Sequence, residues 1–230
     1  MEFEVQELDE FEKLNSLKNT EYTRRLLANK QVFYDLQKAW GPTWHGLCGG
    51  YLFTGREYKL DTTSYEKQEL LYAKAKTAKR VLEVGSYVGH SLFIMLLANP
   101  NLEITSIDID DKYTGPAVKV LEKHFGTSIR FLHTDSITGC QKLIDDGEKF
   151  DFFHLDGDHN EDLIIQEYGR CSQLSSCYPK VKILFDDEMS MRGFSHYLLF
   201  NRSNVKVEMP NCAWSNIYIE FDEPEVKREH

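Results

Sequence analysis

Acidic residues recur directly after short apolar segments of this sequence, a pattern that could bind a cation or assist proton transfer. It occurs in the segments 106–110, 133–136, 155–159 and 185–188. If the apolar segments are parallel strands, their carboxyl ends meet at one edge of a sheet, where ligands bind. Carboxylates gathered there repel one another unless a cation or hydrogen-bond donors lie between them. For a single aspartate a helix N-cap is the plainer interpretation, but it explains the whole set less well.

The segment 80–97 contains a second motif. An apolar run, a glycine-containing turn and a longer apolar stretch follow one another, which predicts a strand, a tight loop and a helix. The loop has the spacing Glu83-x-Gly85-x-x-x-Gly89, and glycine lets a backbone pass close to a ligand. Dinucleotide-binding loops have Gly-x-Gly-x-x-Gly instead, and the carboxylate of Glu83 would repel a pyrophosphate. The motif therefore favours a cationic ligand, with a tight turn of some other α/β protein as the alternative.

The elements that must position these residues alternate between strands and helices. Strands are predicted over 80–84, 103–109, 129–133, 150–155, 181–185, 205–209 and 217–221. Helices are predicted over 90–98, 115–124, 136–145, 160–174 and 190–200. This alternation predicts an α/β fold with a doubly wound, Rossmann-like and mostly parallel seven-stranded sheet. The link between the last two strands is too short for a crossover helix, so the last strand should be antiparallel.

The first 60 or so residues differ from this pattern. Apolar spacing predicts one helix over 21–40, a further helix within 3–17, and a helix from Tyr65 to about Lys76. The glycine- and aromatic-rich stretch 44–56 predicts a long loop, which is either a binding element or a connector. We therefore expect a helical and loop extension over 1–62 that caps the substrate, and a cofactor-binding domain over 63–230.

On these residues the chain resembles class I S-adenosylmethionine-dependent methyltransferases. The resemblance implies that Glu83 lies near the amino end of the methionine moiety and that Asp135 and Ser136 lie near the adenine. Asp108 lies near the end of the second predicted strand, about two dozen residues after Glu83, where nucleotide-binding folds place an acid that accepts hydrogen bonds from ribose hydroxyls. The cofactor-binding residues expected in this way are Glu83, Gly85, Ser86, Tyr87, Gly89, Asp108, Asp135, Ser136 and Asp156.

The segments 155–159 and 185–188 resemble more narrowly the metal-dependent O-methyltransferases, in particular their macrocin-type branch. Carried over position by position, Asp156, Asp186 and Asp187 are the ligands of one divalent ion. Oxygen ligands suit Mg²⁺ best, with Mn²⁺ or Ca²⁺ as alternatives. His159 stands where catechol-type relatives have a lysine, so with Asp156 it is the expected catalytic residue, acting as general base. A hydrogen bond at the start of the next helix is its alternative role.

Composition limits the partners. Lys and Arg number 27 and Asp and Glu 37, giving a formal net charge of −10 without a basic cluster. Nucleic acid and anionic membranes are therefore not expected as partners. No apolar run approaches the roughly 20 residues of a membrane span, and the five cysteines lack Cys-x-x-Cys spacing, which favours reduced, buried thiols. We expect a cytoplasmic protein that acts on a small molecule; the sequence leaves open whether it forms a homo-oligomer.

The expected function is S-adenosylmethionine-dependent O-methylation of a sugar or catechol-like diol, assisted by a divalent metal. One alternative is a hydroxylase, since the segment 156–159 also resembles cephalosporin hydroxylase-like proteins. The other is a cofactor-binding module without catalysis.

Overall fold

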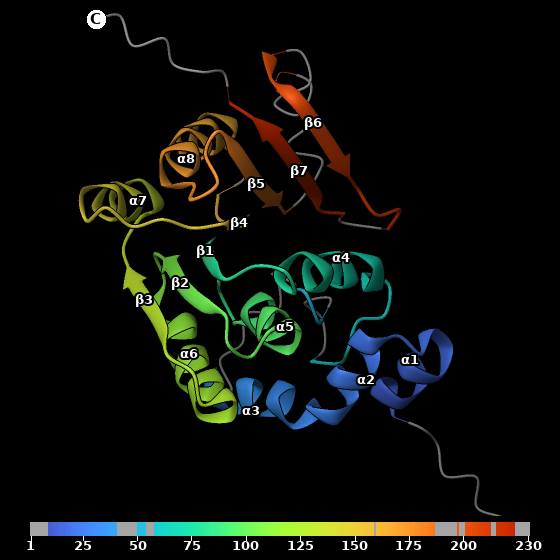
Figure 1. The fold of residues 1–230 in the computed structure, drawn as a ribbon. Helices are drawn as coiled ribbons and strands as arrows, with labels where there is room; N and C mark the ends of the chain where they lie inside the picture. Colours follow the sequence, from blue (N-terminus) through green and yellow to red (C-terminus); the bar gives the residue numbers. More distant parts are fainter. Residues whose placement is uncertain are drawn as a thin grey trace, which may run out of the picture.

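The computed structural model describes residues 9–40, 50–53, 58–158, 160–186, 197, 201–212 and 215–223 (Figure 1). Its seven-stranded sheet has the order β3-β2-β1-β4-β5-β7-β6. Strands β1 to β5 are parallel, and β7 lies antiparallel between β5 and β6. This confirms the predicted architecture, including the antiparallel last strand. The strands are β1 (Arg80–Val84), β2 (Glu103–Asp108), β3 (Ile129–His133), β4 (Phe152–Leu155), β5 (Lys180–Phe185), β6 (Ser203–Glu208) and β7 (Ile217–Asp222).

Helices cover both faces of the sheet. One face carries α7 and α8, and the other carries α4, α5 and α6, with α1 to α3 as an outer layer (Figure 1). No helix of the described residues is long and apolar enough to cross a membrane. The helices are α1 (Glu10–Lys18), α2 (Glu21–Ala28), α3 (Lys30–Trp40), α4 (Tyr65–Ala75), α5 (His90–Ala98), α6 (Asp111–Phe125), α7 (Ser136–Asp145) and α8 (Glu161–Leu174).

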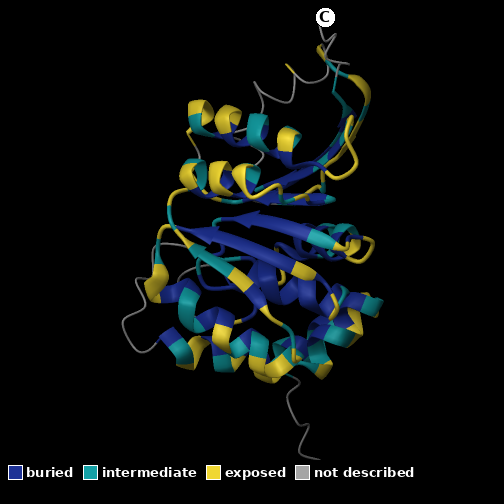
Figure 2. Cartoon of the chain, turned by 60° about the vertical axis from the view of Figure 1, so that its left-hand side comes forward, coloured by how far each residue is buried: buried dark blue, intermediate teal, exposed yellow. Residues whose placement is uncertain are grey.

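The sheet separates two hydrophobic clusters (Figure 2). The larger cluster joins α1 to α6, and Phe33 of α3 stacks on the ring of His90 with centroids 5.4 Å apart. Helix α5 is buried along its whole length. Because residues 9–40 share their core with α5 and α6, they stabilise the face of the sheet on which the glycine loop continues into a helix.

Two of the described helical regions differ from the prediction by more than a single residue at a boundary. The single helix expected over 21–40 is divided into α2 and α3 at Asn29, whose side-chain amide donates to the carbonyl of Arg25 at 2.9 Å. Such local bonds compete with the continuing helix. Helix α6 begins before the expected residue 115, because Asp110 caps it by accepting from the amide of Lys112 at 2.7 Å. The helix predicted over 190–200 lies outside the described residues except for residue 197.

The cysteines differ in part from the expectation that all are buried. Cys140 and Cys171 are buried and Cys212 is half-buried, but Cys177 is exposed. Cys177 lies in the connection between α8 and β5, where its amide donates to the Ser175 hydroxyl at 3.2 Å. Its position in a surface turn explains why it does not enter the core.

Gln68 of α4 holds the segment 50–53 against the core. Its side chain is fully buried, accepts from the Tyr22 hydroxyl at 2.9 Å and donates to the Tyr51 carbonyl at 2.7 Å. Gln68→Leu leaves the Tyr22 hydroxyl without its acceptor and removes the shorter of two hydrogen bonds to the Tyr51 carbonyl, so we expect the free energy of unfolding to fall by about 2 kcal/mol. Chemical denaturation followed by circular dichroism measures this change.

The matched control is Glu66→Gln on the same helix. Glu66 forms an ion pair with Lys18 at 3.1 Å, and both side chains are about two-fifths exposed. This substitution should change the free energy of unfolding by less than about 0.5 kcal/mol. Equal stability of Gln68→Leu and Glu66→Gln would show that Gln68 does not hold the segment.

Candidate functional site

The two glycines of the loop after β1 have left-handed backbone angles, with φ of +80° at Gly85 and +79° at Gly89. A Cβ on Gly85 would lie 2.1 Å from the carbonyl oxygen of Asp156, and a Cβ on Gly89 would lie 2.8 Å from the Cβ of Ala117. Both contacts are too short for any side chain. The loop is therefore packed tightly against the end of β4 and against α6, which is a structural reason for glycine besides the expected approach of a ligand.

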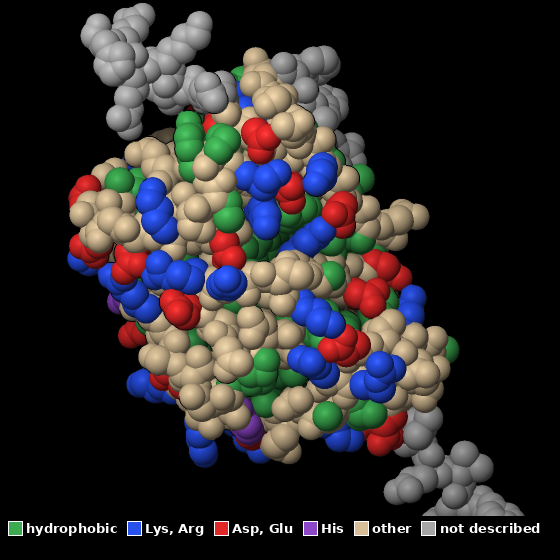
Figure 3. Space-filling model, viewed as in Figure 1, with side chains coloured by type: hydrophobic (Ala, Val, Ile, Leu, Met, Phe, Trp, Pro, Cys, Tyr) green, Lys and Arg blue, Asp and Glu red, His purple; other side chains and the backbone are tan. Residues whose placement is uncertain are grey.

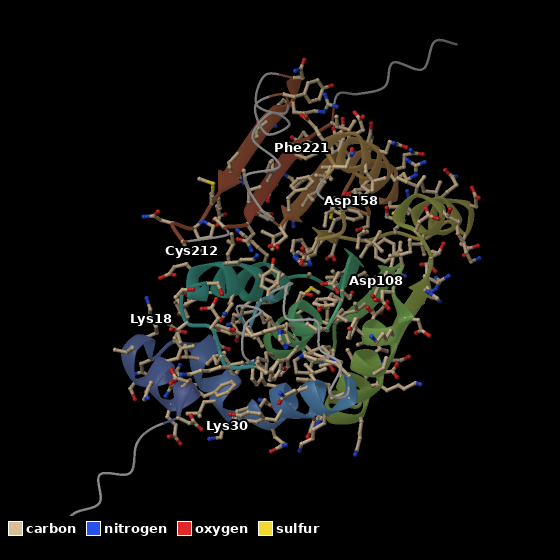
Figure 4. The ribbon with its side chains drawn as sticks, turned by 180° about the vertical axis from the view of Figure 1, so that it is seen from behind. Lys18, Lys30, Asp108, Asp158, Cys212 and Phe221 are labelled. Atoms are coloured by element: carbon tan, nitrogen blue, oxygen red, sulfur yellow. The ribbon has the colours of Figure 1, made fainter. Side chains whose placement is uncertain are left out.

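Asp108, at the end of β2, organises this loop (Figure 4). Its Oδ2 accepts from the amides of Ser86 at 2.9 Å and Tyr87 at 2.7 Å, and from the Thr114 hydroxyl at 3.0 Å. Its Oδ1 accepts from the amide of Asp110 at 2.9 Å. Two amides that could have faced an anionic ligand are thus occupied by a carboxylate of the chain itself.

A buried chain of hydrogen bonds runs from β1 to β4. The register of these strands places His154 beside Glu83, and its Nδ1 lies 2.9 Å from Glu83 Oε1. The other ring nitrogen, Nε2, lies 2.8 Å from the hydroxyl of Tyr51. The amide group of Asn216 donates to that hydroxyl at 3.3 Å, and the Ser86 hydroxyl donates to Glu83 Oε2. The Glu83 carboxylate therefore contacts the glycine loop at one oxygen and His154 at the other.

The Tyr51 hydroxyl lies at one end of this chain and stays protonated. Burial raises the pKa of Tyr51 well above its ordinary value, and the negative charges of Asp186 and Asp156 raise this pKa further. The phenol therefore keeps its proton, and its acceptors within reach are Nε2 of His154 and the carboxylate of Asp186.

Asp156 and Asp186, the carboxylates that follow β4 and β5, lie close together as predicted. One ligand atom each from His154, Asp156 and Asp186 lies within 4.8 Å of the others. The ammonium of Lys67 joins this group, with Nζ 2.6 Å from Oδ1 and 2.7 Å from Oδ2 of Asp186. The side chains of Lys67 and Asp186 are each only 8% exposed, so this is a buried ion pair.

This donor set does not fit a divalent ion in the arrangement that the structure shows. His154 uses both ring nitrogens, one toward Glu83 and one toward Tyr51. Asp186 has both oxygens on the Lys67 ammonium. The third expected ligand, Asp187, and the expected base, His159, lie outside the described residues. We therefore derive no catalytic step through a metal ion.

Three other acids at strand ends cap helices or form turns. Asp110 caps α6, and Asp135 caps α7 by accepting from the amide of Thr138 at 2.9 Å. That amide lowers the pKa of Asp135. Asp158 is exposed and accepts from the amide of Asn160 at 3.0 Å. Each of these residues thus has the cap or turn role that is the plainer interpretation. The predicted contacts of Asp135 and of the half-buried Ser136, the first residue of α7, with the adenine stay predictions.

Sequence reasoning missed several polar residues of this region. Lys67, Tyr51 and Asn216 carry no local signal, because their partners lie far away in the sequence. His154 did carry a signal, since it is a polar residue within an apolar strand and pairs in register with Glu83. Glu167 of α8 was also missed; its side chain is almost fully buried, and its Oε1 has no hydrogen-bond partner among the described residues.

The seven-stranded sheet, with its glycine loop and carboxylates at the carboxyl ends of the strands, has the Rossmann-like architecture of methyltransferases. A sequence model of the O-methyltransferase family matches residues 59–175, just over half of the chain, and the chain belongs to this family. The matched region includes the glycine loop, Asp108 and Asp156, which confirms the resemblance noted in the sequence.

Known proteins agree with this family. A caffeoyl-CoA O-methyltransferase-like protein of Arabidopsis thaliana is 32% identical over 90 residues, which cover 38% of this chain and 39% of that protein. The chain thus spans about two-fifths of the length of the curated relatives that it matches.

Solved structures agree with the fold. The O-methyltransferase of Bacillus cereus, in complex with S-adenosylhomocysteine (SAH), has a TM-score of 0.60 at 13% identity, covering 93% of this chain and 100% of that one. TomG of Streptomyces achromogenes, involved in tomaymycin synthesis and bound to S-adenosylmethionine, has a TM-score of 0.63 at 18% identity, covering 94% and 100%.

Proposed function

We propose that this protein is an S-adenosylmethionine-dependent O-methyltransferase that acts on a hydroxyl group of a small molecule. The observation that carries the proposal is the carboxylate of Asp108, which accepts from the amides of Ser86 and Tyr87. Family membership and the cofactors of the two solved structures support it.

The charges of the loop discriminate between cofactors. Asp108 and Glu83 place two carboxylates at the loop, so the negative pyrophosphate of a dinucleotide would be repelled. S-adenosylmethionine carries a positive sulfonium and an amino group, which such a site attracts. Oδ1 of Asp108 has a single hydrogen-bond partner among the described residues and can accept from a ribose hydroxyl. The residues present therefore fit this cofactor, and we retain the cofactor-binding set expected from the sequence.

The chain's own residues would then orient the acceptor and move its proton. When bound, the cofactor supplies a methyl group on a sulfonium, which is already electrophilic. The protein must hold the acceptor oxygen in line with that methyl group and remove its proton. We propose His159 as the base, as the sequence resemblance implies. The preference for a sugar or catechol-like diol that the sequence predicts depends on a divalent ion at Asp156, Asp186 and Asp187. The contacts of Asp186 with Lys67 do not fit that ion, so the proposal is limited to a hydroxyl group of a small molecule.

The acceptor side includes part of the segment before α4. Tyr51 contacts His154, and Lys67 lies over the Tyr51 ring at 4.6 Å. This contact supports our proposal that the extension over 1–62 contributes to the acceptor pocket at the carboxyl edge. Positive and negative side chains are interspersed on the face seen in Figure 3, which suits a small-molecule acceptor better than a polynucleotide.

Titration calorimetry with S-adenosylmethionine and with SAH tests the proposal. We expect saturable binding of both at a stoichiometry of one, and no binding of NAD⁺ as the control ligand, because the loop has no free anion cradle. A folded protein that gives no heat with either adenosyl ligand would exclude the proposed function. Binding of the cofactor without turnover of any hydroxylated acceptor would instead indicate a binding module.

A further inference from the structure

A buried lysine ammonium lies at the carboxyl edge of the sheet. Lys67 lies on α4, and its ammonium contacts both oxygens of Asp186 at 2.6 and 2.7 Å. Lys67 is only 6% exposed, so its charge is held inside the protein. The ammonium of Lys67 contacts both oxygens of a carboxylate that is itself buried, so the two side chains form an ion pair in the protein interior.

Three separate elements fix the position of Lys67. Its ammonium lies over the ring of Tyr51 at 4.6 Å, in cation–π geometry. The side-chain amide of Asn216, just before β7, donates to the backbone carbonyl of Lys67 at 3.2 Å and to the Tyr51 hydroxyl at 3.3 Å. Helix α4, the segment 50–53 and the start of β7 therefore converge on one side chain. Such support limits how far the ammonium can move away from Asp186.

An ammonium in this position and a divalent ion on Asp186 exclude one another. A divalent ion coordinated by Asp186 would lie about 2 Å from a carboxylate oxygen. That oxygen is also within 2.7 Å of Nζ, so the two cations would be close neighbours in a poorly solvated site. Their repulsion is strong at such distances. The ion could enter only if Lys67 left its contacts with Tyr51 and Asp186.

We propose that the Lys67 ammonium takes the place of a divalent ion at this edge, so that the protein holds its acceptor-site cation as a side chain and binds no metal there. The role of this cation rests on the proposed function, because in O-methylation it would stabilise the negative charge that develops on the acceptor oxygen. It differs from the metal-dependent scheme expected from the sequence. It predicts that the carboxylates of Asp156 and Asp186 become a metal site only when Lys67 is removed.

The test measures binding of Mn²⁺ by electron paramagnetic resonance in the wild type, in Lys67→Met and in Lys74→Met. Lys74 is the matched control, because it lies on the same helix, forms an ion pair with Glu208 and covers the ring of Tyr218 at 3.9 Å. We expect no saturable Mn²⁺ site in the wild type or in Lys74→Met. Lys67→Met should gain one saturable Mn²⁺ site, at least about tenfold tighter than the residual, unsaturable binding of the wild type. Lys67→Met combined with Asp186→Asn should lose that site again.

Either of two results would overturn the proposal: one saturable Mn²⁺ site in the wild type, or no site in a folded Lys67→Met protein. Lys67→Gln, which keeps a hydrogen-bond donor, repeats the test if Lys67→Met does not fold, and the wild-type titration needs no variant. Titration of the same samples with SAH tests the proposed function separately from the proposed role of Lys67. Failure of folded wild-type protein to bind SAH would reject the proposed function, whereas the Mn²⁺ comparison would still decide the role of Lys67.

Discussion

Asp108→Ala should weaken binding of SAH by about 100-fold or more and lower the free energy of unfolding by about 2–4 kcal/mol, because several buried donors lose their acceptor. The amides of Ser86 and Tyr87 and the hydroxyl of Thr114 all donate to this carboxylate. Titration calorimetry and chemical denaturation measure the two effects. Asp108→Asn should fall between wild type and alanine, since an amide oxygen still accepts but carries no charge.

Asp110→Ala is the control for this prediction. Asp110 lies two residues further along and caps α6 through the amide of Lys112 at 2.7 Å, without a side-chain bond to the glycine loop among the described residues. It should cost about 1 kcal/mol of stability and leave the SAH affinity nearly unchanged. Equal SAH affinities of Asp108→Ala and Asp110→Ala would contradict both proposed roles of Asp108, the contact with the ribose and the ordering of the glycine loop.

Glu167→Gln should make the protein more stable at pH 8 by on the order of 3 kcal/mol and leave it nearly unchanged at pH 4. Burial raises the pKa of Glu167 from 4.5 to about 7, and the charge of Asp158 adds to this while the Ser136 side chain and Arg170 oppose it. The folded protein thus keeps the carboxyl protonated where the unfolded chain ionises it. Its contribution is full below pH 4.5 and is lost as the pH rises to about 7.

The measurement is the difference in unfolding free energy between variant and wild type at several pH values, so that contributions of other groups cancel. Glu161→Gln on the same helix is the control, because Glu161 is exposed and its replacement should give a difference within about 0.5 kcal/mol at every pH. A difference for Glu167→Gln that does not change between pH 4 and pH 8 would show that this carboxyl ionises equally in the folded and unfolded states.

Local signals were sufficient for much of the sheet and for its flanking helices. Strands β1 and β3 and helices α5 and α7 have the predicted boundaries. Residues that favour helix starts mark two of these boundaries: Gly89, with a left-handed backbone, precedes α5, and Asp135 caps α7. The break at Asn29 was missed because apolar spacing continues across it, and the side-chain bond to Arg25 that ends α2 leaves no trace in that spacing.

The site was predictable only where it follows strand ends. Asp156 and Asp186 come together, and Asp108 lies further along the same edge, because the topology of a parallel sheet gathers the carboxyl ends of its strands. Lys67 could not be predicted in the same way, since its partner Asp186 is 119 residues away in the sequence and only the folded chain brings α4 to the end of β5. A pattern of carboxylates predicts that a cation is needed, but not whether a metal or a side chain supplies it.

The place of β7 has a consequence for synthesis of the chain. Strand β7 pairs with both β5 and β6, and Asn216 just before it bonds to Tyr51, 165 residues earlier. A nascent chain that has reached only β6 cannot dock that strand, and the edge of β5 stays open to other chains. The contact between Asn216 and Tyr51 closes a very long loop, so it forms late in folding. The hydrogen bonds of Asn216 are therefore completed after the first half of the sheet, and a ribosome-bound intermediate would hold the glycine loop before Asn216 reaches Tyr51.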